Sequence, residues 1–169
     1  RARALARLET ELDFAPDTLA DTLPAYAREI YDSPDSSLAM KANAARLQIL
    51  SQERITDELN KIILTKQPSR GFKLMQATGL LNHFFEELLA LQGIETRNGK
   101  AHKDNFLHTL EVLDNLAQHT DNLWLRWAAI LHDIAKAPTK RFDPEVGWTF
   151  HGHEELGAKM VPRLFKHKP

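Results

Sequence analysis

Residues 123–136 read LWLRWAAILHDIAK, and the rest of the chain is organised around this stretch. Its apolar residues recur at three- and four-residue spacing, which predicts a helix with one face in a hydrophobic core: Leu123, Trp127, Ile130 and Ile134. His132 and Asp133 follow near the end of that helix. Burying a carboxylate is costly unless it is paired or bound to a cation. The stretch therefore predicts a core helix with a candidate ligand pair at its end. For the pair taken alone, the alternative is an ordinary His-Asp pair at the surface or at the edge of the core.

Further histidines stand in two other stretches with a helical period. His108 lies within residues 105–117, and His153 opens the segment that follows residue 152, with His151 two positions earlier. Three helices could thus bring three or four imidazoles and one carboxylate to one point. Imidazole with carboxylate suits a divalent transition metal such as Zn, Mn, Fe, Co or Ni. The alternative is a cluster of polar side chains with a structural role.

One set of residues resembles the HD superfamily of metal-dependent phosphohydrolases: His108, His132-Asp133, Lys136, His153 and Gly157-Ala158. The resemblance implies that His108, His132 and Asp133 hold a divalent cation. His153 and His151 would complete the ligand set or bind beside it. The cation would activate a water molecule for attack on phosphorus. Asp133 would orient that water and Lys136 would neutralise the phosphate oxygens, which makes these two the expected catalytic residues.

A narrower resemblance covers most of the chain. The segments HKDNFLHTLEVLDN (102–115) and FHGHEELGAKM (150–160) resemble the HD domain that follows bacterial tRNA nucleotidyltransferases, the CCA-adding enzymes and poly(A) polymerases. The segment SQERITDELNKIIL (51–64) resembles the RNA-binding body of the same family, and residues 68–75 and 78–81 extend that match. The two resemblances occur in the family's order.

The family resemblance implies an all-α fold in two parts. We expect a helical RNA-binding neck and body domain over residues 1–96 and the N-terminal part of an all-helical HD domain over 97–169, because residues 95–100 have the composition of a linker. The chain would be a fragment of a nucleotidyltransferase that binds tRNA and lacks the catalytic head. That head would use ATP, CTP and Mg²⁺. The HD part would hydrolyse phosphoesters such as cyclic phosphates on RNA ends, although the truncated fragment alone could be inactive.

Basic residues in the central part are candidates for RNA contacts: Arg54, Lys61, Lys66, Arg70 and Lys73. Contacts to phosphates need no tight motif, so scattered Lys and Arg can supply them. The alternative is an ordinary solvated mixture of charges, in which Arg54 pairs with Glu58 along a helix. The resemblance also implies that Arg1 is the arginine of the family's nucleotide-selecting Asp-x-x-Arg motif, and a terminal arginine in a fraying helix is the alternative.

The periodicity predicts helices over residues 1–13, 17–31, 38–50, 52–66, 105–117 and 123–136, and one that begins at His153. Residues 32–37 are expected to form a loop, and 142–150 a loop or a short extended excursion. Ser51, Asp104 and Asp121 are the expected N-caps of the helices that follow them. Trp124 and Trp127 are expected to pack in the core rather than to stack on bases.

Composition limits the remaining choices. The 169 residues have a formal net charge of -1, with 43% hydrophobic and 27% charged residues, so the chain can bury a core. No apolar run approaches the roughly 18 to 20 residues that a membrane span needs. The absence of cysteine excludes disulfides and thiolate metal sites. With no secretory segment visible, we expect a cytoplasmic protein.

Two other functions fit the residues less completely. The first is a free-standing HD phosphohydrolase that acts on small nucleotides, with residues 1–96 as an unrelated helical module. The second is a non-catalytic RNA-binding helical protein with a degenerate HD fold.

Overall fold

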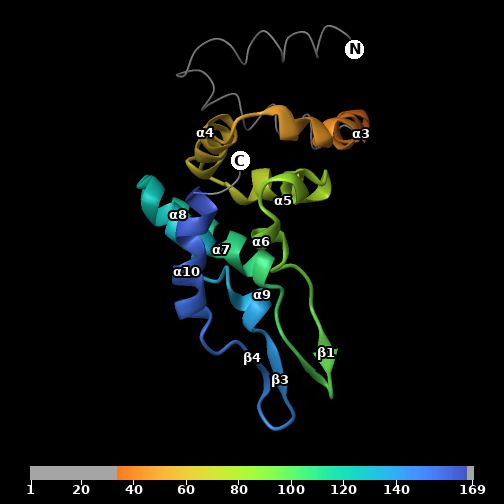
Figure 1. Ribbon diagram of the computed structural model, residues 1–169, viewed down its shortest axis with the longest axis vertical. Coiled ribbons are helices and arrows are strands. Elements are labelled where there is room, and N and C mark those ends of the chain that lie inside the picture. Colours follow the sequence, from red (N-terminus) through yellow and green to blue (C-terminus); the bar gives the residue numbers. More distant parts are fainter. Residues whose placement is uncertain (1–33, 167–169) are drawn as a thin grey trace, which may run out of the picture. The chain divides into compact units, whose positions relative to one another are not determined.

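The computed structural model describes residues 34–166, and the described residues from Ala39 onward belong to one compact unit. Within the described residues the fold is helical, which confirms the predicted all-α class (Figure 1). The helices are α3 (Pro34–Asn43), η1 (Ala44–Ile49), α4 (Gln52–Ile63), α5 (Ser69–Ala77), η2 (Leu80–His83), α6 (Glu86–Leu89), α7 (Asn105–Ala117), α8 (Leu123–Leu131), α9 (Lys136–Thr139) and α10 (His153–Lys166). Among the described residues no helix is long and apolar enough to cross a membrane. The helices expected over 1–13 and 17–31, and Arg1, lie outside the described residues.

Two of the three predicted helix caps are confirmed. The Ser51 side chain accepts a hydrogen bond from the Arg54 N–H, and the Asp104 side chain accepts one from the Leu107 N–H at 2.9 Å. The third prediction is wrong by one residue, because Asn122 caps α8 in place of Asp121. The carboxylate of Asp121 is engaged elsewhere, in an ion pair with Arg126.

Two element boundaries also differ from the sequence prediction. Helix α3 begins at Pro34, inside the segment expected to be a loop. Proline is compatible with the first helical position, where its missing N–H has no intrahelical acceptor. Residues 44–49 then form the tighter helix η1, so the single helix expected over 38–50 is two elements. Helix α4 ends at Ile63 rather than Lys66.

Two short antiparallel hairpins add to the helices. Strands β1 (Thr96–Arg97) and β2 (Lys100–Ala101) are joined by Asn98 and Gly99, which both have positive φ, at 51° and 73°. An Asn-Gly pair favours this tight hairpin turn, and the linker prediction missed it. Strands β3 (Arg141–Asp143) and β4 (Gly147–Thr149) form the second hairpin.

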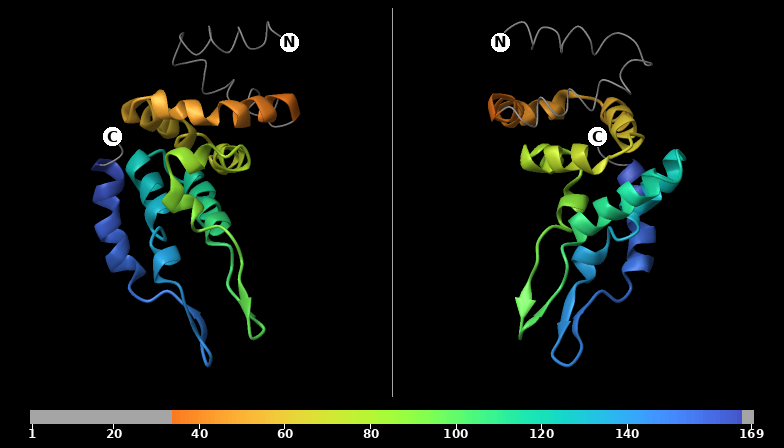
Figure 2. Two further views of the ribbon diagram at one scale, coloured as in Figure 1. Left: turned by 45° about the vertical axis from the view of Figure 1, so that its right-hand side comes forward. Right: turned by 180° about the vertical axis from the view of Figure 1, so that it is seen from behind.

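The two hairpins lie side by side, apart from α4 and α5 (Figure 2). The Trp148 indole N–H donates to the carbonyl of Lys100 at 3.0 Å. The Lys100 ammonium donates in return to the carbonyls of Pro144 and Glu145 in the second hairpin turn. Neither two-stranded hairpin would be stable alone, so these contacts stabilise both.

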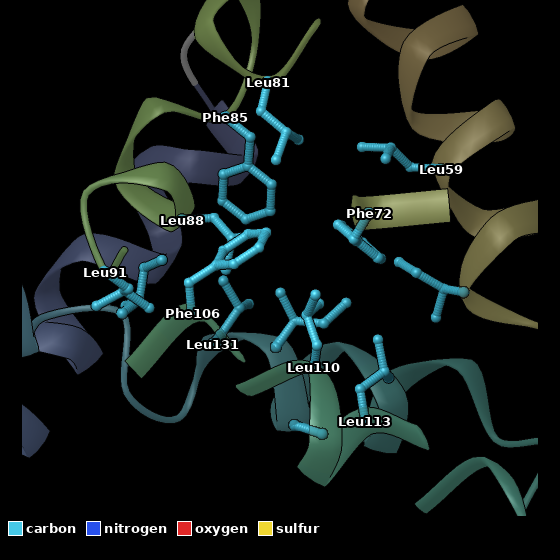
Figure 3. Close-up of a cluster of buried hydrophobic side chains, with 14 of the residues drawn as sticks. Leu59, Phe72, Leu81, Phe85, Leu88, Leu91, Phe106, Leu110, Leu113 and Leu131 are labelled. Carbon is cyan, nitrogen blue, oxygen red and sulfur yellow. The ribbon is translucent and has the colours of Figure 1, made fainter. Parts of the chain in front are cut away.

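One hydrophobic core runs through the helices on both sides of residue 96. Figure 3 shows part of it, with α4 and α5 contributing Leu59 and Phe72, and α7 contributing Phe106 and Leu110. Each fully buried side chain of this kind contributes about 1.5 to 3 kcal/mol. Ile130 of α8 is also fully buried, as the periodicity predicted. The residues of the two predicted domains therefore stabilise one another.

The two tryptophans of α8 differ in their surroundings. Trp127 is buried and donates its indole N–H to the Asn60 side chain at 2.8 Å, which confirms its predicted place in the core. Trp124 is 70% exposed, so the prediction that it packs in the core is wrong. Trp124 lies three residues before Trp127 in the helix, and its indole contacts only the half-exposed ring of Phe165 from α10 among the described aromatic rings.

Arg126 fixes the position of α8. Its guanidinium is 1% exposed and donates to four backbone carbonyls and one carboxylate: Ile63, Thr65, Ala117, Thr120 and Asp121. The last carbonyls of a helix have no intrahelical partner. Arg126 supplies donors to such carbonyls at the ends of both α4 and α7, and thereby joins three helices.

Candidate metal centre and RNA-binding surface

The candidate metal ligands stand where three helical elements begin or end. His108 lies in the first turn of α7, and its N–H donates to the Asp104 carbonyl at 3.0 Å. Helix α8 ends at Leu131, and His132 and Asp133 occupy a tight turn before α9. The single helix expected over 123–136 is therefore interrupted. The turn buries Ile134 and Ala135 almost completely, which favours the interruption.

The structure brings His108, His132 and Asp133 together. One ligand atom from each residue lies within 4.8 Å of the other two. Within this group, His132 Nε2 lies 3.2 Å from Asp133 Oδ2. A transition metal with bonds of about 2.1 Å holds its ligands roughly 3 to 3.5 Å apart. Small side-chain rotations would bring these three atoms to that spacing, so the residues fit a divalent cation.

Two imidazoles are oriented by backbone carbonyls. His132 Nδ1 lies 2.8 Å from the carbonyl of Ala129, and His153 Nδ1 lies 2.8 Å from the carbonyl of Phe150. In each neutral ring Nδ1 then carries the proton and Nε2 has a free lone pair. Hydrogen bonding of this kind at the distal nitrogen is typical of metal-binding histidines.

His108 is kept neutral by its surroundings. Burial lowers the pKa of His108 below its ordinary value, and the nearby charge of Lys103 lowers it further, whereas the Asp133 carboxylate raises it. A neutral imidazole can donate a lone pair to a cation, and a protonated one cannot. The His108 side chain is therefore available as a ligand at neutral pH.

Asp133 is the centre of the cluster. It is 3% exposed, and Lys136 Nζ lies 2.7 Å from its Oδ2. On the other carboxylate oxygen, Oδ1, His153 Nε2 approaches to 3.5 Å. His153 thus lies beside the group of three potential ligands. His151 is exposed in the turn before α10 and is outside that group.

The candidate RNA-binding residues are all exposed: Arg54, Lys61, Lys66, Arg70 and Lys73. The Lys61 ammonium pairs with the Glu58 carboxylate at 2.8 Å, in place of the Arg54 pair expected from the sequence. Lys66, Arg70 and Lys73 follow one another at four- and three-residue spacing along α5 and the loop before it. We call these three residues the α5 basic strip.

Helix α7 holds the segment that carries this strip. The Asp114 carboxylate accepts from the Ser69 N–H at 2.9 Å, at the start of α5. The Gln118 side chain donates to the carbonyl of Lys66 at 2.9 Å. The same helix carries His108 in its first turn. One helix therefore connects the strip to the candidate metal ligands.

Comparison with known proteins accounts for both halves of the chain. Residues 33–91 match the family described as the probable RNA and SrmB-binding site of polymerase A, and residues 105–169 match the HD domain family. The A-adding tRNA nucleotidyltransferase of Deinococcus radiodurans is 34% identical over 167 residues, which are 97% of this chain and 36% of that protein. The chain belongs to the tRNA nucleotidyltransferase family.

Other family members align over shorter segments. The CC-adding tRNA nucleotidyltransferase of Thermus thermophilus is 36% identical over 120 residues, 66% of this chain and 26% of that protein. The multifunctional CCA protein of Pseudomonas fluorescens is 33% identical over 124 residues, 71% of this chain and 29% of its own length. The chain spans about a third of the length of the curated relatives it matches. No solved structure matches it significantly.

Residues to which the family resemblance gives no role also shape the site. Lys103 acts on His108 through its charge, Phe150 contacts both Lys136 and His153, and Arg126 anchors α8. A signal for Arg126 was available, because it is a charged residue next to Trp127 on an otherwise apolar helix face. Phe150 gave no such signal, since its contacts depend on the second hairpin.

Proposed function

We propose that this chain is the RNA-binding and HD portion of a tRNA nucleotidyltransferase, and that it binds tRNA and holds a metal-dependent phosphohydrolase site. The observation that carries the proposal is the convergence of His108, His132 and Asp133 behind a helical body with an exposed basic strip. An alignment with one relative over 97% of the chain supports a body and an HD part that belong to one protein. It favours this reading over a free-standing HD enzyme.

In the proposed site the imidazoles of His108 and His132 and the carboxylate of Asp133 would hold a divalent transition metal such as Ni, Mn, Zn or Co. When bound, such a cation supplies Lewis acidity toward a phosphoryl oxygen and activates water. Asp133 accepts a hydrogen bond from the attacking water. Lys136, 17% exposed, neutralises charge on the phosphoryl oxygens. His153, beside Asp133, completes the site, and His151 reaches it only if the turn before α10 moves.

The proposed RNA contacts lie on α4 and α5. Residues 59–85 contain Lys61, Lys66, Arg70 and Lys73 and no Asp or Glu. A surface of one charge sign attracts phosphates without reading the sequence. Because Lys61 already pairs with Glu58, the α5 basic strip carries most of the contact, with Arg54 as a minor contributor.

The remaining functions belong to the proposed parent protein. Its catalytic head would add nucleotides from ATP and CTP with Mg²⁺, and Arg1 would contribute to nucleotide selection. The names of the relatives, A-adding, CC-adding and multifunctional CCA protein, support nucleotide addition to tRNA as the parent activity. We place the boundary between the RNA-binding domain and the HD domain at residues 96 and 97, between the two family matches, and the protein in the cytoplasm.

The metal-site proposal is tested with an Asp133→Ala variant. Divalent metal content and hydrolysis of a cyclic phosphodiester are measured for this chain and for the complete parent protein. We expect the variant to lose both, because the only carboxylate of the ligand group is removed. Glu111→Ala removes an exposed carboxylate from the same helix as His108 and is the matched control. Equal metal content and activity in wild type and Asp133→Ala would refute the catalytic proposal.

The RNA proposal is tested by reversing the charges of the α5 basic strip. The variant Lys66→Glu/Arg70→Glu/Lys73→Glu should bind tRNA at least about tenfold more weakly at low salt. Its dependence of log affinity on log salt should flatten by about 2, because each lost phosphate contact removes roughly 0.7 to 0.9 from the slope. Charge reversal at the exposed Arg163 of α10 is the control. Unchanged affinity and slope would remove the strip from the interface.

A further inference from the structure

Phe150 lies between the second hairpin and α10, where it contacts two residues of the proposed site through different atoms. Its carbonyl faces His153, and its ring faces Lys136. None of the family motifs assigns a role to this side chain. The two contacts can be considered separately because a substitution at position 150 changes the ring and leaves the carbonyl.

The carbonyl of Phe150 fixes the imidazole of His153. It accepts from the His153 backbone N–H at 3.2 Å and lies 2.8 Å from the Nδ1 atom of the same residue. This double contact is made possible by the turn through Gly152, whose φ of +76° suits glycine. With Nδ1 occupied, Nε2 of His153 is directed to Asp133 Oδ1 at 3.5 Å.

The ring of Phe150 holds the ammonium of Lys136. Lys136 Nζ lies 5.6 Å from the ring centroid, within the range of a cation–π interaction. Asp133 Oδ2 accepts from the same ammonium at 2.7 Å. An ammonium has three donors, so the contact with Asp133 leaves donors for another acceptor. The ring restricts the directions in which those donors can point. Unlike an acceptor oxygen, the ring does not occupy one of the donors.

The hairpins in turn hold the ring. The His102 imidazole meets the Phe150 ring edge-on, with centroids 6.1 Å apart, and meets Trp148 at 5.1 Å. Trp148 is fixed to the first hairpin by its hydrogen bond to the Lys100 carbonyl. The first hairpin is further tied to the segment before β3 by the ion pair of Glu95 with Lys140. The position of the Phe150 ring therefore depends on both hairpins.

We propose that Phe150 is a positioning residue of the HD site: its ring face holds the Lys136 ammonium in place for a phosphoryl oxygen, and its carbonyl holds His153 against Asp133. This inference rests on the proposed function, in which Lys136 meets phosphate. It assigns the two hairpins a role as the support of the phosphate-binding side of the site. The metal ligands His108 and His132 are held independently, by α7 and α8.

The test compares Phe150→Leu with wild type. The metal affinity is measured first, by titration with Mn²⁺ or Ni²⁺, and the affinity of the metal-loaded protein for inorganic phosphate is measured next. Leucine preserves apolar volume and removes the ring, so we expect phosphate to bind about three- to tenfold more weakly. Metal affinity should change less than about twofold. Phe150→Tyr keeps the aromatic face and should bind phosphate as wild type does.

Phe165→Leu is the matched control, because the ring of Phe165 packs on Trp124 and Trp127 of α8 rather than on Lys136 or the hairpin aromatic residues. If Phe150→Leu fails to fold, fluorinated phenylalanines at position 150 replace it, since each added fluorine weakens the ring face at nearly constant shape. Phosphate affinity should then fall stepwise with fluorination.

Two negative results have different meanings. A wild-type protein that binds neither divalent metal nor phosphate would overturn the proposed function itself. A wild-type protein that binds both, with phosphate affinity unchanged in Phe150→Leu and in the fluorinated series, would overturn the role of Phe150 alone. The carbonyl role is read from the ¹⁵N shifts of His153, which should show the proton on Nδ1 in wild type and in Phe150→Leu. A proton on Nε2 would overturn it.

Discussion

Arg126 and Asp133 lie seven residues apart and are both charged and almost fully buried, yet their surroundings differ. Arg126 donates to four backbone carbonyls and to Asp121, and its partners belong to α4, α7 and the loop before α8. The resolved partners of the Asp133 carboxylate are the side chains of His132, Lys136 and His153. The fold fixes the position of a backbone carbonyl, whereas a side-chain partner can rotate away.

This difference is the one we expect between a structural charge and the charge of the proposed metal site. The donors of Arg126 are used up within the fold, so the residue can stabilise helix ends and has nothing to offer a ligand. Asp133 pairs with the Lys136 ammonium, and the Nε2 atoms of His132 and His153 that face its carboxylate carry lone pairs that a bound metal would accept. A buried charge of the second kind is a liability for stability and is typical of sites with a chemical role.

The largest expected effect is on Arg126. Replacement with Met leaves the buried carbonyl of Ile63 and the part-buried carbonyl of Thr65 without their donor. A buried acceptor without a donor costs about 1 to 3 kcal/mol, so we expect a total loss of about 3 to 5 kcal/mol over the four carbonyls. We expect this loss in the free energy of unfolding measured with urea. Arg163→Met, on the exposed face of α10, should change it by less than about 0.5 kcal/mol. A loss below about 1 kcal/mol for Arg126→Met would contradict the structural role assigned to Arg126.

Asp133→Asn should show the opposite pattern. The amide oxygen can still accept from Lys136, so we expect the unfolding free energy of the metal-free protein to change by at most about 1 kcal/mol. Its affinity for Mn²⁺ or Ni²⁺ should fall at least about 100-fold, because a neutral amide replaces an anionic ligand. Calorimetric metal titration and urea unfolding give the two numbers. An Asn variant that unfolds as readily as Arg126→Met would mean that Asp133 is structural too.

Gly152→Ala tests the turn that presents His153. The φ of +76° at this position costs a residue with a Cβ atom about 1 kcal/mol, although no atom within 4 Å would meet that Cβ. Gly157→Ala is the control of opposite sign. Its Cβ would make ordinary contacts with Ala135 and Ile134 inside a helix, and alanine there should stabilise by roughly 1 kcal/mol. Thermal unfolding of the two variants should shift in opposite directions, and a shift in the same direction would contradict the assignment of strain to Gly152.

The smallest expected effect is on pH dependence. Because burial lowers the pKa of His108 in the folded protein, the unfolded chain binds the proton first as pH falls below about 6.5. Stability should therefore decrease from that pH downward and level off below the folded pKa. The difference between wild type and His108→Gln in urea unfolding isolates this contribution from the other histidines. A difference that does not vary between pH 7 and pH 5 would show that His108 is not desolvated.

The sequence predicted the features that depend on neighbouring residues. Helix periodicity and the caps Ser51 and Asp104 are confirmed, because a cap acts within three residues of its own position. The end of α8 at Leu131 was missed, since burial of Ile134 and Ala135 against the rest of the fold decides it. The prediction for Trp124 is wrong because periodicity alone does not show whether the rest of the fold covers its indole, which is exposed.

For the site, the family motif identified residues that the structure places together, and their metal binding stays a prediction. His108, His132 and Asp133 could be grouped from the sequence because the motif carries the long-range information that periodicity lacks. Phe150 could not, since its contact with Lys136 requires two hairpins to pack on each other. The Asn98-Gly99 pair indicates the first hairpin, whereas the composition of the segment predicts only a linker there.

The length of helix α7 fixes the spacing between two parts of the molecule. His108 lies in its first turn. Gln118 follows ten residues later at the other end of the helix, where its side chain donates to the backbone carbonyl of Lys66. With a rise of 1.5 Å per residue, those two positions are separated by roughly 15 Å along the axis. A nucleic acid strand that touches both must bridge this fixed gap, so the length of one helix limits which phosphate of a bound strand can meet the metal ligands.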